Sequence, residues 1–487
     1  MLDIVYLLTC ITLVVLPLFI PLSIMRQNSY RIIESAKVIK SRVERVVVPI
    51  FITVICAIME RSLPFASCLI LVAYSIGCLF YYIIRRKSKR KITAKTFRLV
   101  VCYFLLCIPV CAIVCIYERA FYLPLITFVV LCLSKILLLP YEKRNELKFE
   151  KRAKEKLKKI KPKIIAVTGS YGKTTFKNVL SHLLACKYKV CVSPKSYNTP
   201  QGVCITINNH LKDDDDVLIL EMGARYKGDI KRLVNMVQPE YCVLTSIGNQ
   251  HLATFKIEER LIKEKISIFD LVATYNFYNA DCDLIPKTVP ATACGRNGKY
   301  SYSNTIKTEN GWVFDFNYKG KIESITCPIY ADYIPQTLCL AFAVALELGV
   351  TIDELKKRAK TLKEVAHRQQ LLYNGKDVII DDAYNSNESG FISAVNLLAT
   401  FPQKKIIITP GVVELGKSQF VINEKLARYA NSRIDEILCY GVNAKALKKG
   451  GGEKVKTFSS LKACMNYYET IKGDKAVLFE NDLPDCY

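Results

Sequence analysis

The sequence lacks the residue spacings that mark zinc-finger and disulfide-rich proteins. Its 487 residues include only four histidines and one tryptophan, and no two of its 20 cysteines stand in a C-x-x-C pair. This excludes the common structural zinc sites, which need cysteines or histidines at short spacing. Nine cysteines lie in hydrophobic stretches before residue 140 and the rest are scattered through apolar segments. We therefore expect reduced cysteines that act as small hydrophobic residues in a protein facing the cytosol.

Acidic residues are scarce relative to basic ones. Asp and Glu number 44 against 69 Lys and Arg, which gives a formal net charge of +25. Such a charge is typical of nucleic-acid-binding proteins, but no zinc-finger spacing and no aromatic, basic RNA-binding pattern accompanies it. The basic residues instead crowd three segments next to hydrophobic stretches, residues 26–45, 85–98 and 143–163. We therefore expect a membrane partner and no nucleic acid.

Long apolar stretches are confined to the first 140 residues. A helix needs about 20 apolar residues to cross the bilayer core. Four stretches meet that length: residues 6–25, 63–84, 99–117 and 121–140. The first lacks the basic start and the small-residue cleavage site of a signal peptide, so we interpret it as an anchor. Residues 46–59 are shorter and would span only with snorkelling side chains or a thinner bilayer.

The placement of the basic segments favours five spans over four. Five spans put the N-terminus outside, all three basic segments in the cytoplasm and only short turns outside, as the positive-inside rule requires. Four spans, with residues from 141 in the cytoplasm, would instead place the basic residues 26–45 outside. We predict a multi-pass protein of the inner (cytoplasmic) membrane, with residues from about 141 in the cytoplasm. Residues 143–163 have the pattern of a charged helix, either a solvated linker or a helix lying on anionic lipid headgroups.

A loop with two glycines and a lysine follows the first strand predicted beyond this linker. Residues 164–168 form a β-branched apolar run typical of a buried strand, and a helix is predicted over 176–184. The loop between them consists of Gly169, Ser170, Tyr171, Gly172, Lys173, Thr174 and Thr175. Glycines let backbone N–H groups point at phosphate oxygens, and the helix N-terminus adds positive potential. Lys173 would neutralise phosphate charge and Thr174 would hold Mg²⁺. The alternative is an ordinary glycine turn with an incidental lysine.

The loop is the shorter G-x-x-G-K-T form, because Val167 stands where the usual phosphate loop begins with glycine. Residues 168–175, TGSYGKTT, resemble the TGxxGKTT loop of the Mur ligase family, the ATP-dependent amide ligases of peptidoglycan synthesis and their relatives. Over about residues 163–480, further segments resemble motifs of that family in the same order, most closely those of its D-alanyl-D-alanine-adding ligases. These segments are YNTPQG (197–202), EMG (221–223), LTSIGNQHLATF (244–255), KEKISIF (263–269), NAD (279–281), HRQQ (367–370), DDAYNSN (381–387) and VELG (413–416).

The resemblance implies ATP and Mg²⁺ as cofactors and assigns roles to residues in these motifs. It implies that Lys173, Lys265 and His251 are catalytic, with Lys265 carbamylated toward a second Mg²⁺. It also implies that Asn279, Arg368 and Asp382 contact the nucleotide together with the loop. Thr174, Glu221 and His251 would bind the metal. Contacts with the substrate would come from Asn198, Thr199, Asn385 and Lys417. For Glu221 the residues agree independently, since a carboxylate at the carboxyl end of an apolar strand is well placed for Mg²⁺.

The expected architecture is α/β behind a membrane bundle. We predict about five transmembrane helices, then a P-loop Mur ligase central domain and a doubly wound, Rossmann-like C-terminal domain, in which strands and helices alternate. Four strands are expected in that last domain, in the runs VIIDDAY (378–384), KIIITP (405–410), EILCYG (436–441) and KAVLFE (475–480). The expected bounds are 1–140 for the spans, 141–163 for the basic linker, 164–364 for the central domain and 365–487 for the C-terminal domain.

Three departures from the family bear on the substrate. Membrane spans stand where the peptidoglycan enzymes have a UDP-sugar-binding domain, YADYIPQ (330–336) replaces a Gly-x-His-Asn-x-x-Asn segment, and FENDLPD (479–485) replaces a Lys-Gly-Ser-type ending. The leading hypothesis is therefore a ligase of cell-envelope or capsular polysaccharide synthesis. It would join an amine to a carboxylate that belongs to a lipid-linked substrate. The alternatives are a peptidoglycan D-alanyl-D-alanine-adding ligase, an ATP-driven transporter or sensor, and an inactive scaffold. The near absence of charge within the spans argues against transport.

Overall fold

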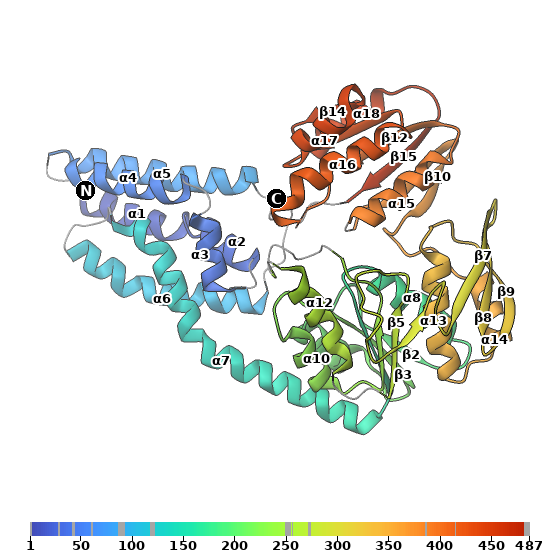
Figure 1. The fold of residues 1–487 in the computed structure, drawn as a ribbon. Coiled ribbons are helices and arrows are strands. Elements are labelled where there is room, and N and C mark those ends of the chain that lie inside the picture. The colour runs from blue at the N-terminus through green and yellow to red at the C-terminus, as the bar shows by residue number, and fades with distance from the viewer. Residues whose placement is uncertain are drawn as a thin grey trace. The chain divides into compact units, whose positions relative to one another are not determined.

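The computed structural model describes residues 2–27, 30–40, 44–59, 62–85, 93–116, 122–248, 255, 257–270, 274–384, 387–413 and 415–481. They form two compact units, one reaching to Leu147 and one starting at Lys148 (Figure 1). The first is helical and the second is α/β. None of the 18 cysteines in the described part of the chain forms a disulfide, as predicted.

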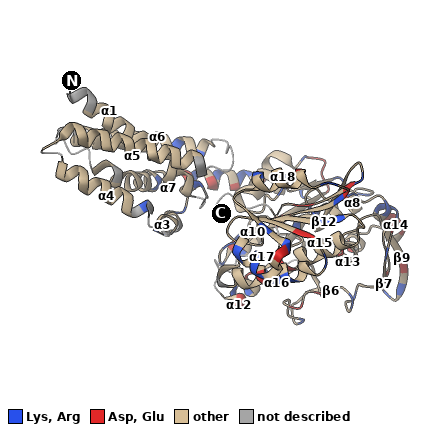
Figure 2. Ribbon diagram, turned by 90° about the horizontal axis from the view of Figure 1, so that it is seen from above, with Lys and Arg blue, Asp and Glu red and all other residues tan. Residues whose placement is uncertain are grey.

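Apolar helices make up the first unit, and charged side chains are absent along most of their length (Figure 2). The helices are α1 (Leu2–Val15), α2 (Phe19–Gln27), α3 (Ile32–Lys40), α4 (Glu44–Met59), α5 (Pro64–Arg85), α6 (Ala94–Ile116) and the first part of α7 (Leu123–Ile160). Pro17 explains the break between α1 and α2, because a proline disfavours helix at the residue before it.

Four helical stretches are long and apolar enough to cross a bilayer: Tyr6–Arg26, Pro64–Ile83, Ala94–Val114 and Leu125–Ile160. They overlap the four full-length stretches predicted from the sequence. The apolar part of α4, Val47–Met59, is shorter. The number of spans therefore stays a prediction.

A buried polar cluster joins segments from different parts of the helical unit. Lys135 lies within the apolar stretch of α7 and forms an ion pair with Glu142, and the two side chains are only 6% and 7% exposed. Lys95, at the start of α6, lies 3.3 Å from the same Glu142 oxygen. The Tyr30 hydroxyl is 2.6 Å from that of Thr96, and the Lys95 ammonium lies over the Tyr30 ring. Tyr30, from the basic segment 26–45, and Lys95 and Thr96, from the basic segment 85–98, thus meet beside Glu142.

Helix α7 continues for 38 residues, roughly 57 Å at 1.5 Å per residue. Its charged second half belongs to the α/β unit. Phe149, Ala153 and Leu157, spaced four residues apart, pack into the core there. Asn208 Nδ2 donates to the Phe149 carbonyl (3.0 Å), and Lys159 pairs with Asp213 (2.7 Å). The predicted solvated linker is therefore wrong for this face, because an apolar stripe hidden among the lysines is buried.

A six-stranded parallel sheet forms the core of the middle part of the chain. Its order is β2 (Val190–Val192), β3 (Val217–Met222), β1 (Lys163–Thr168), β4 (Tyr241–Leu244), β5 (Tyr275–Asn279) and β6 (Thr292–Cys294). One face is covered by α8 (Lys173–Leu184), α13 (Ile334–Glu347) and α14 (Ile352–Lys360), and the other by α7, α9 (Pro200–Ile205), α10 (Asp229–Val237) and α12 (Glu258–Ile266). Burial on both faces explains the continuous apolar strands.

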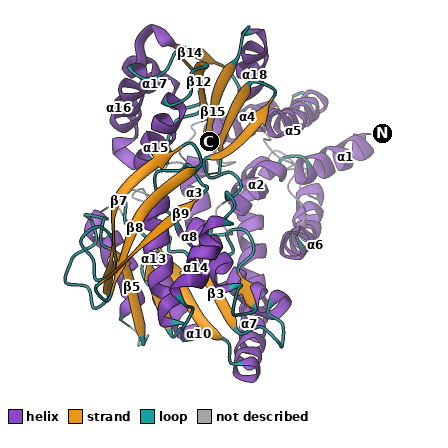
Figure 3. Cartoon of the chain, turned by 90° about the vertical axis from the view of Figure 1, so that its right-hand side faces the viewer, coloured by secondary structure: helices purple, strands orange, loops and turns teal. Residues whose placement is uncertain are grey.

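A small antiparallel sheet extends this middle part. It consists of β7 (Ser301–Thr308), β8 (Gly311–Tyr318) and β9 (Lys321–Cys327). It packs beside α13 (Figure 3). Its apolar residues join the core on that face of the parallel sheet.

A second sheet forms the C-terminal part, in the order β10 (Gln370–Asn374), β11 (Asp377–Asp382), β15 (Lys475–Glu480), β12 (Lys404–Thr409), β13 (Glu436–Tyr440) and β14 (Val455–Phe458). All neighbours are parallel except β10 and β11. The helices α15 (Glu388–Ala399), α16 (Gln419–Asn431) and α17 (Ala444–Gly451) cover one face and α18 (Leu461–Thr470) covers the other. The four strands predicted here are present. The two edge strands β10 and β14 were missed, because they are short and rich in polar residues.

We expect Lys135→Met to destabilise the helical unit by about 3 kcal/mol, because it removes the buried partner of Glu142 and leaves this buried carboxylate with only the partly exposed Lys95. The measurement is SDS-induced unfolding of the detergent-solubilised protein, followed by circular dichroism. Lys135→Met combined with Glu142→Met should recover most of the loss. Lys151→Met, which removes a lysine from an exposed pair with Glu155, is the control. Equal stability of Lys135→Met and this control would contradict the role of the pair.

Candidate functional site

The loop between β1 and α8 needs both of its glycines, for different geometric reasons. Gly172 has a φ of +79° and precedes the first residue of α8, a conformation that favours glycine. A Cβ on Gly169 would lie 2.1 Å from Thr245 Oγ1. The predicted strand, loop and helix are all present. The first N–H groups of α8, which begins at Lys173, have no acceptor within the helix and make this end suited to an anion.

The segment that follows β4 braces this loop. Ser246 Oγ accepts from the Tyr171 N–H and donates to the Tyr171 carbonyl, both at 2.9 Å. Thr245 Oγ1 also donates to that carbonyl (2.6 Å). Ser170 Oγ bonds to the backbone of Gly248. Ser246, which stands where the family has asparagine, therefore holds the loop through a single hydroxyl.

The Lys173 ammonium folds back over the loop. It donates to the carbonyls of Gly169 and Ser170. Burial lowers the pKa of Lys173 to about 8; the Glu221 carboxylate opposes this shift and the Arg368 guanidinium adds to it. An anion bound in the loop would favour the charged form of this lysine.

Glu221 is the second-last residue of β3 and lies at the same edge of the sheet, as predicted. Its side chain is 1% exposed, and Oε1 forms an ion pair of 2.6 Å with the ammonium of the equally buried Lys177. Neither carboxylate oxygen has a hydrogen-bond donor among the residues that the structure describes, and Oε2 has no ion-pair partner there either. A buried carboxylate oxygen without a partner is costly, and a hard divalent cation would satisfy it. Glu221 thus fits the predicted role of a Mg²⁺ ligand.

Lys265 lies on α12 and is 1% exposed. Burial lowers its pKa well below the usual range and the charge of Lys173 lowers it further, while Glu264 and Asp229 oppose the shift. Glu264 is itself occupied in accepting the N–H groups of Gly228 and Ile230 at the start of α10. Burial therefore favours the neutral form of this amine, which lies near the phosphate loop.

The described residues include no group of three or more His, Cys, Asp or Glu side chains that could hold a metal ion together. The predicted ligand His251 lies outside the described residues. Thr174, the second residue of α8, is half-buried beside the loop. Glu221 Oε2 is therefore the described feature that fits Mg²⁺.

Asn279 ends β5 and its amide is largely engaged within the protein. Its Nδ2 donates to the Thr245 carbonyl (2.9 Å), and its Oδ1 accepts from the Asp281 N–H (3.1 Å) and from Gln336 Nε2 (2.9 Å). Gln336 closes the 330–336 segment that departs from the family pattern. Asn279 therefore acts here as a brace, and its predicted contact with a nucleotide stays a prediction.

Arg368 is held between two residues in the left-handed region, His367 (φ +59°) and Gln369 (φ +52°). Such conformations cost roughly 1–3 kcal/mol each and persist where surrounding contacts fix them. His367 Nδ1 bonds to Asp381 Oδ2 (2.7 Å), and the Arg368 carbonyl accepts from the Tyr333 hydroxyl (2.9 Å). The guanidinium lies 4.3 Å from the ring centroid of Tyr384. This strained segment brings Arg368 close enough for its charge to act on Lys173.

Asp382 ends β11 and is 7% exposed. Burial raises its pKa to about 7 against the restraining effects of Arg368 and of hydrogen bonds from Gln369. Its predicted partner in the nucleotide site, Arg368, is therefore close to it. Asp382 is the carboxyl group in this part of the chain whose ionisation falls near neutral pH.

Two of the four predicted substrate residues make hydrogen bonds that support the fold, and the side chains of the other two are not described by the structure. The Asn198 carbonyl accepts from the Gly223 N–H (2.8 Å), and Thr199 Oγ1 caps α9 by accepting from the Gly202 N–H (3.2 Å). Asn385 lies outside the described residues. Lys417 lies in a short 3₁₀ turn, Gly416–Ser418, and its side chain is not among those described.

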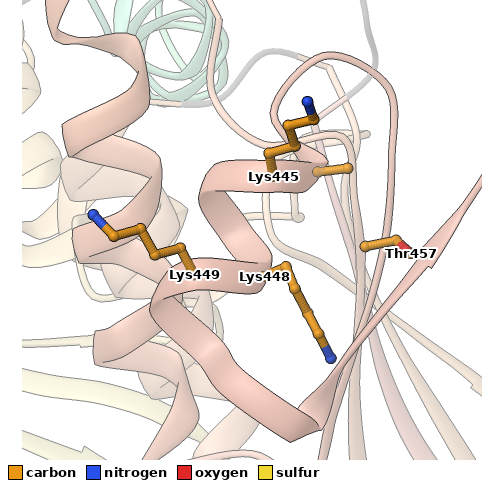
Figure 4. Close-up of a pocket in the computed structure, with 5 residues that line it drawn as sticks. Lys445, Lys448, Lys449 and Thr457 are labelled. Carbon is orange, nitrogen blue, oxygen red and sulfur yellow. The ribbon is translucent and has the colours of Figure 1, made fainter.

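An open hollow of about 470 Å³ lies on the C-terminal part and is lined by Ala444, Lys445, Lys448, Lys449 and Thr457. The three ammonium groups point in different directions (Figure 4). Lys448 donates to the Val455 carbonyl (2.8 Å) and Lys449 pairs with Glu424 (3.0 Å). Three lysine side chains line the hollow, but their charged ends do not converge on one point. None of the predicted site residues lines it.

The raised pKa of Asp382 predicts a pH-dependent stability. The folded state binds the proton more tightly than the unfolded state, whose pKa is near the ordinary 3.8. The free energy of unfolding should therefore fall as pH rises from about 4 to 7, by up to about 1.4 kcal/mol per unit. Asp382→Asn should remove this slope and stabilise the protein above pH 7, in urea unfolding followed by circular dichroism. An unchanged slope would contradict the assignment.

Comparisons with known proteins agree with this geometry. Residues 167–345 match the Mur ligase middle domain. The UDP-N-acetylmuramoyl-tripeptide–D-alanyl-D-alanine ligase of Haemophilus influenzae is 27% identical over 297 residues, which cover 58% of this chain and 65% of that protein. The chain thus matches less than two thirds of that ligase.

Two solved structures share the fold. MurF from Acinetobacter baumannii superposes with a TM-score of 0.64 at 22% identity, covering 69% of this chain and 77% of that one. MurF ligase from Thermotoga maritima, solved in complex with ADP, gives 0.63 at 25% identity, covering 69% and 80%. Residues 167–345 therefore form a Mur ligase middle domain, in a chain that is similar to D-alanyl-D-alanine-adding ligases over 58% of its length.

Proposed function

We propose that this protein is a membrane-anchored, ATP- and Mg²⁺-dependent ligase that joins a carboxylate to an amine and forms ADP. One observation carries the proposal: the braced loop with Lys173 lies beside a buried carboxylate, Glu221, that keeps one oxygen without a partner. The guanidinium of Arg368 lowers the pKa of Lys173, and the charge of Lys173 in turn lowers the pKa of the buried Lys265. This is a site prepared for polyphosphate and a divalent cation.

The reaction class explains why these groups are needed. Bound Mg·ATP supplies the phosphoryl group that converts the substrate carboxylate into an acyl phosphate, and the amine then displaces phosphate to form the amide. Charge on the transferring group must be neutralised by preorganised donors. Lys173 and the N-terminus of α8 supply positive potential at the loop, and Glu221 would hold the cation. Arg368 would place a planar, permanently charged donor near the phosphates from the C-terminal part.

Lys265 suits the carbamylation that the family resemblance implies. A carbamate forms when a neutral amine takes up CO₂ and releases a proton to solvent, and burial lowers the pKa of Lys265 and so favours the neutral amine. The new group would carry negative charge next to Lys173 and would reverse the repulsion between the two lysines. We propose that the carbamate oxygens help to hold a second Mg²⁺, with His251 as a further ligand.

The comparisons favour the peptidoglycan-type alternative over capsular polysaccharide synthesis. The matched relatives are named for adding D-alanyl-D-alanine to a UDP-N-acetylmuramoyl-tripeptide. We therefore propose a short peptide as the amine and a peptide or sugar-linked carboxylate as the acid. The apolar helices before the ligase part favour an acid delivered at the membrane, such as a lipid-linked precursor.

The proposed organisation keeps the sequence-derived bounds. About five spans occupy residues 1–140, the charged part of α7 covers 141–163, and the two ligase domains cover 164–364 and 365–487 on the cytoplasmic side. The cluster around Glu142, where residues of the basic segments 26–45 and 85–98 meet, supports that side. A transporter or sensor would also use the loop, but it would hydrolyse ATP without an amine.

Release of ADP by the detergent-solubilised protein should depend on both an acid and an amine. The assay supplies ATP, Mg²⁺, D-alanyl-D-alanine and candidate muramoyl peptides, free and lipid-linked, and couples ADP to NADH oxidation. Lys173→Ala should lower the rate at least about a thousandfold, because an unscreened phosphate charge is left in the loop. Hydrolysis that never requires the amine would favour the transporter alternative and would overturn the proposal.

Lys265 should carry a carbamate. Protein equilibrated with ¹³C-bicarbonate should show a carbamate carbon signal in NMR that is lost in Lys265→Met. Activity should fall in CO₂-depleted buffer and return when bicarbonate is added. The control is Lys263→Met, which removes an exposed lysine two residues earlier on α12. A carbamate signal that persists in Lys265→Met would contradict the assignment.

A further inference from the structure

Lys177 is a buried cation at the phosphate loop that none of the motif comparisons assigns. It lies one turn after Lys173 on α8 and its side chain is 2% exposed. Its ammonium donates to the carbonyls of Ser193 and Lys195, each at 2.7 Å, and lies 2.6 Å from Glu221 Oε1 as an ion pair. Two of the three N–H donors of the ammonium are therefore used by backbone carbonyls, and its charge faces the carboxylate. These contacts fix the group in position.

The two carbonyls that Lys177 binds belong to the segment that follows β2. This segment crosses the end of β3, where Ser193 Oγ accepts from the Glu221 N–H (3.3 Å). Lys195 has a φ of +48°, a costly conformation for a residue with a side chain. The next residue, Ser196, receives a hydrogen bond from the Tyr384 hydroxyl (2.5 Å). Lys177 thus links Glu221 to the strained segment that reaches the C-terminal part.

We propose that Lys177 is a positioning residue that holds the Glu221 carboxylate for a divalent cation. It fixes Oε1 and leaves Oε2 as the oxygen without a protein partner. This inference rests on the proposed function, since it deepens the role of Glu221 in the same site. Lys177 acts through Glu221 and touches neither the nucleotide nor the substrate.

Positioning and simple charge neutralisation predict opposite results. An ammonium 2.6 Å from a carboxylate weakens the attraction of that carboxylate for a cation. If Lys177 only neutralised charge, its removal would strengthen metal binding. If it orients the carboxylate, its removal frees Glu221 to rotate and weakens metal binding, typically by about 10- to 100-fold for groups that orient a metal ligand.

The test measures Mn²⁺ binding, which needs no knowledge of the substrates. The complete detergent-solubilised protein is titrated with Mn²⁺ in the presence of ADP and followed by electron paramagnetic resonance. ADP affinity is measured separately in EDTA. Lys177→Met should weaken Mn²⁺ binding at least about tenfold and leave metal-free ADP affinity within about twofold. Lys187→Met is the matched control, since it removes the same charge from an exposed lysine that donates to the Gly349 carbonyl.

Two further variants keep the outcome decisive. Lys177→Gln keeps a donor for the backbone carbonyls, and it should fold even where Lys177→Met does not, while still weakening Mn²⁺ binding. Unchanged or tighter Mn²⁺ binding in a folded Lys177 variant overturns the inference. Glu221→Gln should also lose Mn²⁺ binding. If Glu221→Gln binds Mn²⁺ normally, the proposed metal site itself is wrong, and this result separates its failure from that of Lys177.

Discussion

The candidate site depends on the parallel register of four neighbouring strands. Thr168 of β1 is paired with Met222 of β3 and with Leu244 of β4, and Leu244 is paired with Tyr278 of β5. Because parallel strands end at the same edge, the loop that begins at Gly169, the carboxylate of Glu221, the segment from Thr245 and the amide of Asn279 come together there. A shift of one residue in any of these strands would turn its terminal side chain to the other face.

Positive charge is concentrated at this edge, and its distribution explains what the site is prepared to bind. Burial lowers the pKa values of Lys173 and Lys265, and repulsion lowers them further, by Arg368 on Lys173 and by Lys173 on Lys265. Glu221 is the acidic group that opposes this effect on Lys173. Several cations held close together by burial store repulsion that a polyphosphate would relieve. The electrostatics of the protein alone therefore favour a highly charged anion over a neutral ligand.

The sequence predicted the parts of the fold that follow from local patterns. The buried strand before the loop, the helix after it, the strand ending in Glu221 and four strands of the C-terminal sheet were predicted from apolar runs and turn residues. Long-range contacts could not be predicted in this way. Lys177 looks like an ordinary helix lysine until the fold places Ser193, Lys195 and Glu221 around it. The buried stripe on α7 was hidden because lysines and glutamates separate its apolar residues.

The same limit applies to the site residues. Glycine and lysine positions of the loop are visible in the sequence because the chemistry demands those residue types at that spacing. The hydrogen bonds of Asn279 to Thr245, Asp281 and Gln336 depend on three separate elements and have no local signal. The left-handed residues on either side of Arg368 are equally invisible, since neither is a glycine.

Two buried lysine–glutamate pairs in the described part of the chain have different surroundings. In the helical unit, one oxygen of Glu142 receives both Lys135 and Lys95, and two cations compensate one carboxylate. At the sheet edge, Lys177 donates to two backbone carbonyls and forms an ion pair with Oε1 of Glu221, while the second oxygen of Glu221 has no partner among the described residues. Desolvating a carboxylate is costly unless its oxygens are satisfied. Glu221 carries this cost next to a phosphate-type loop. The partner of its second oxygen is therefore a bound ligand and not a protein group, and a divalent cation has the charge and oxygen preference to be that partner.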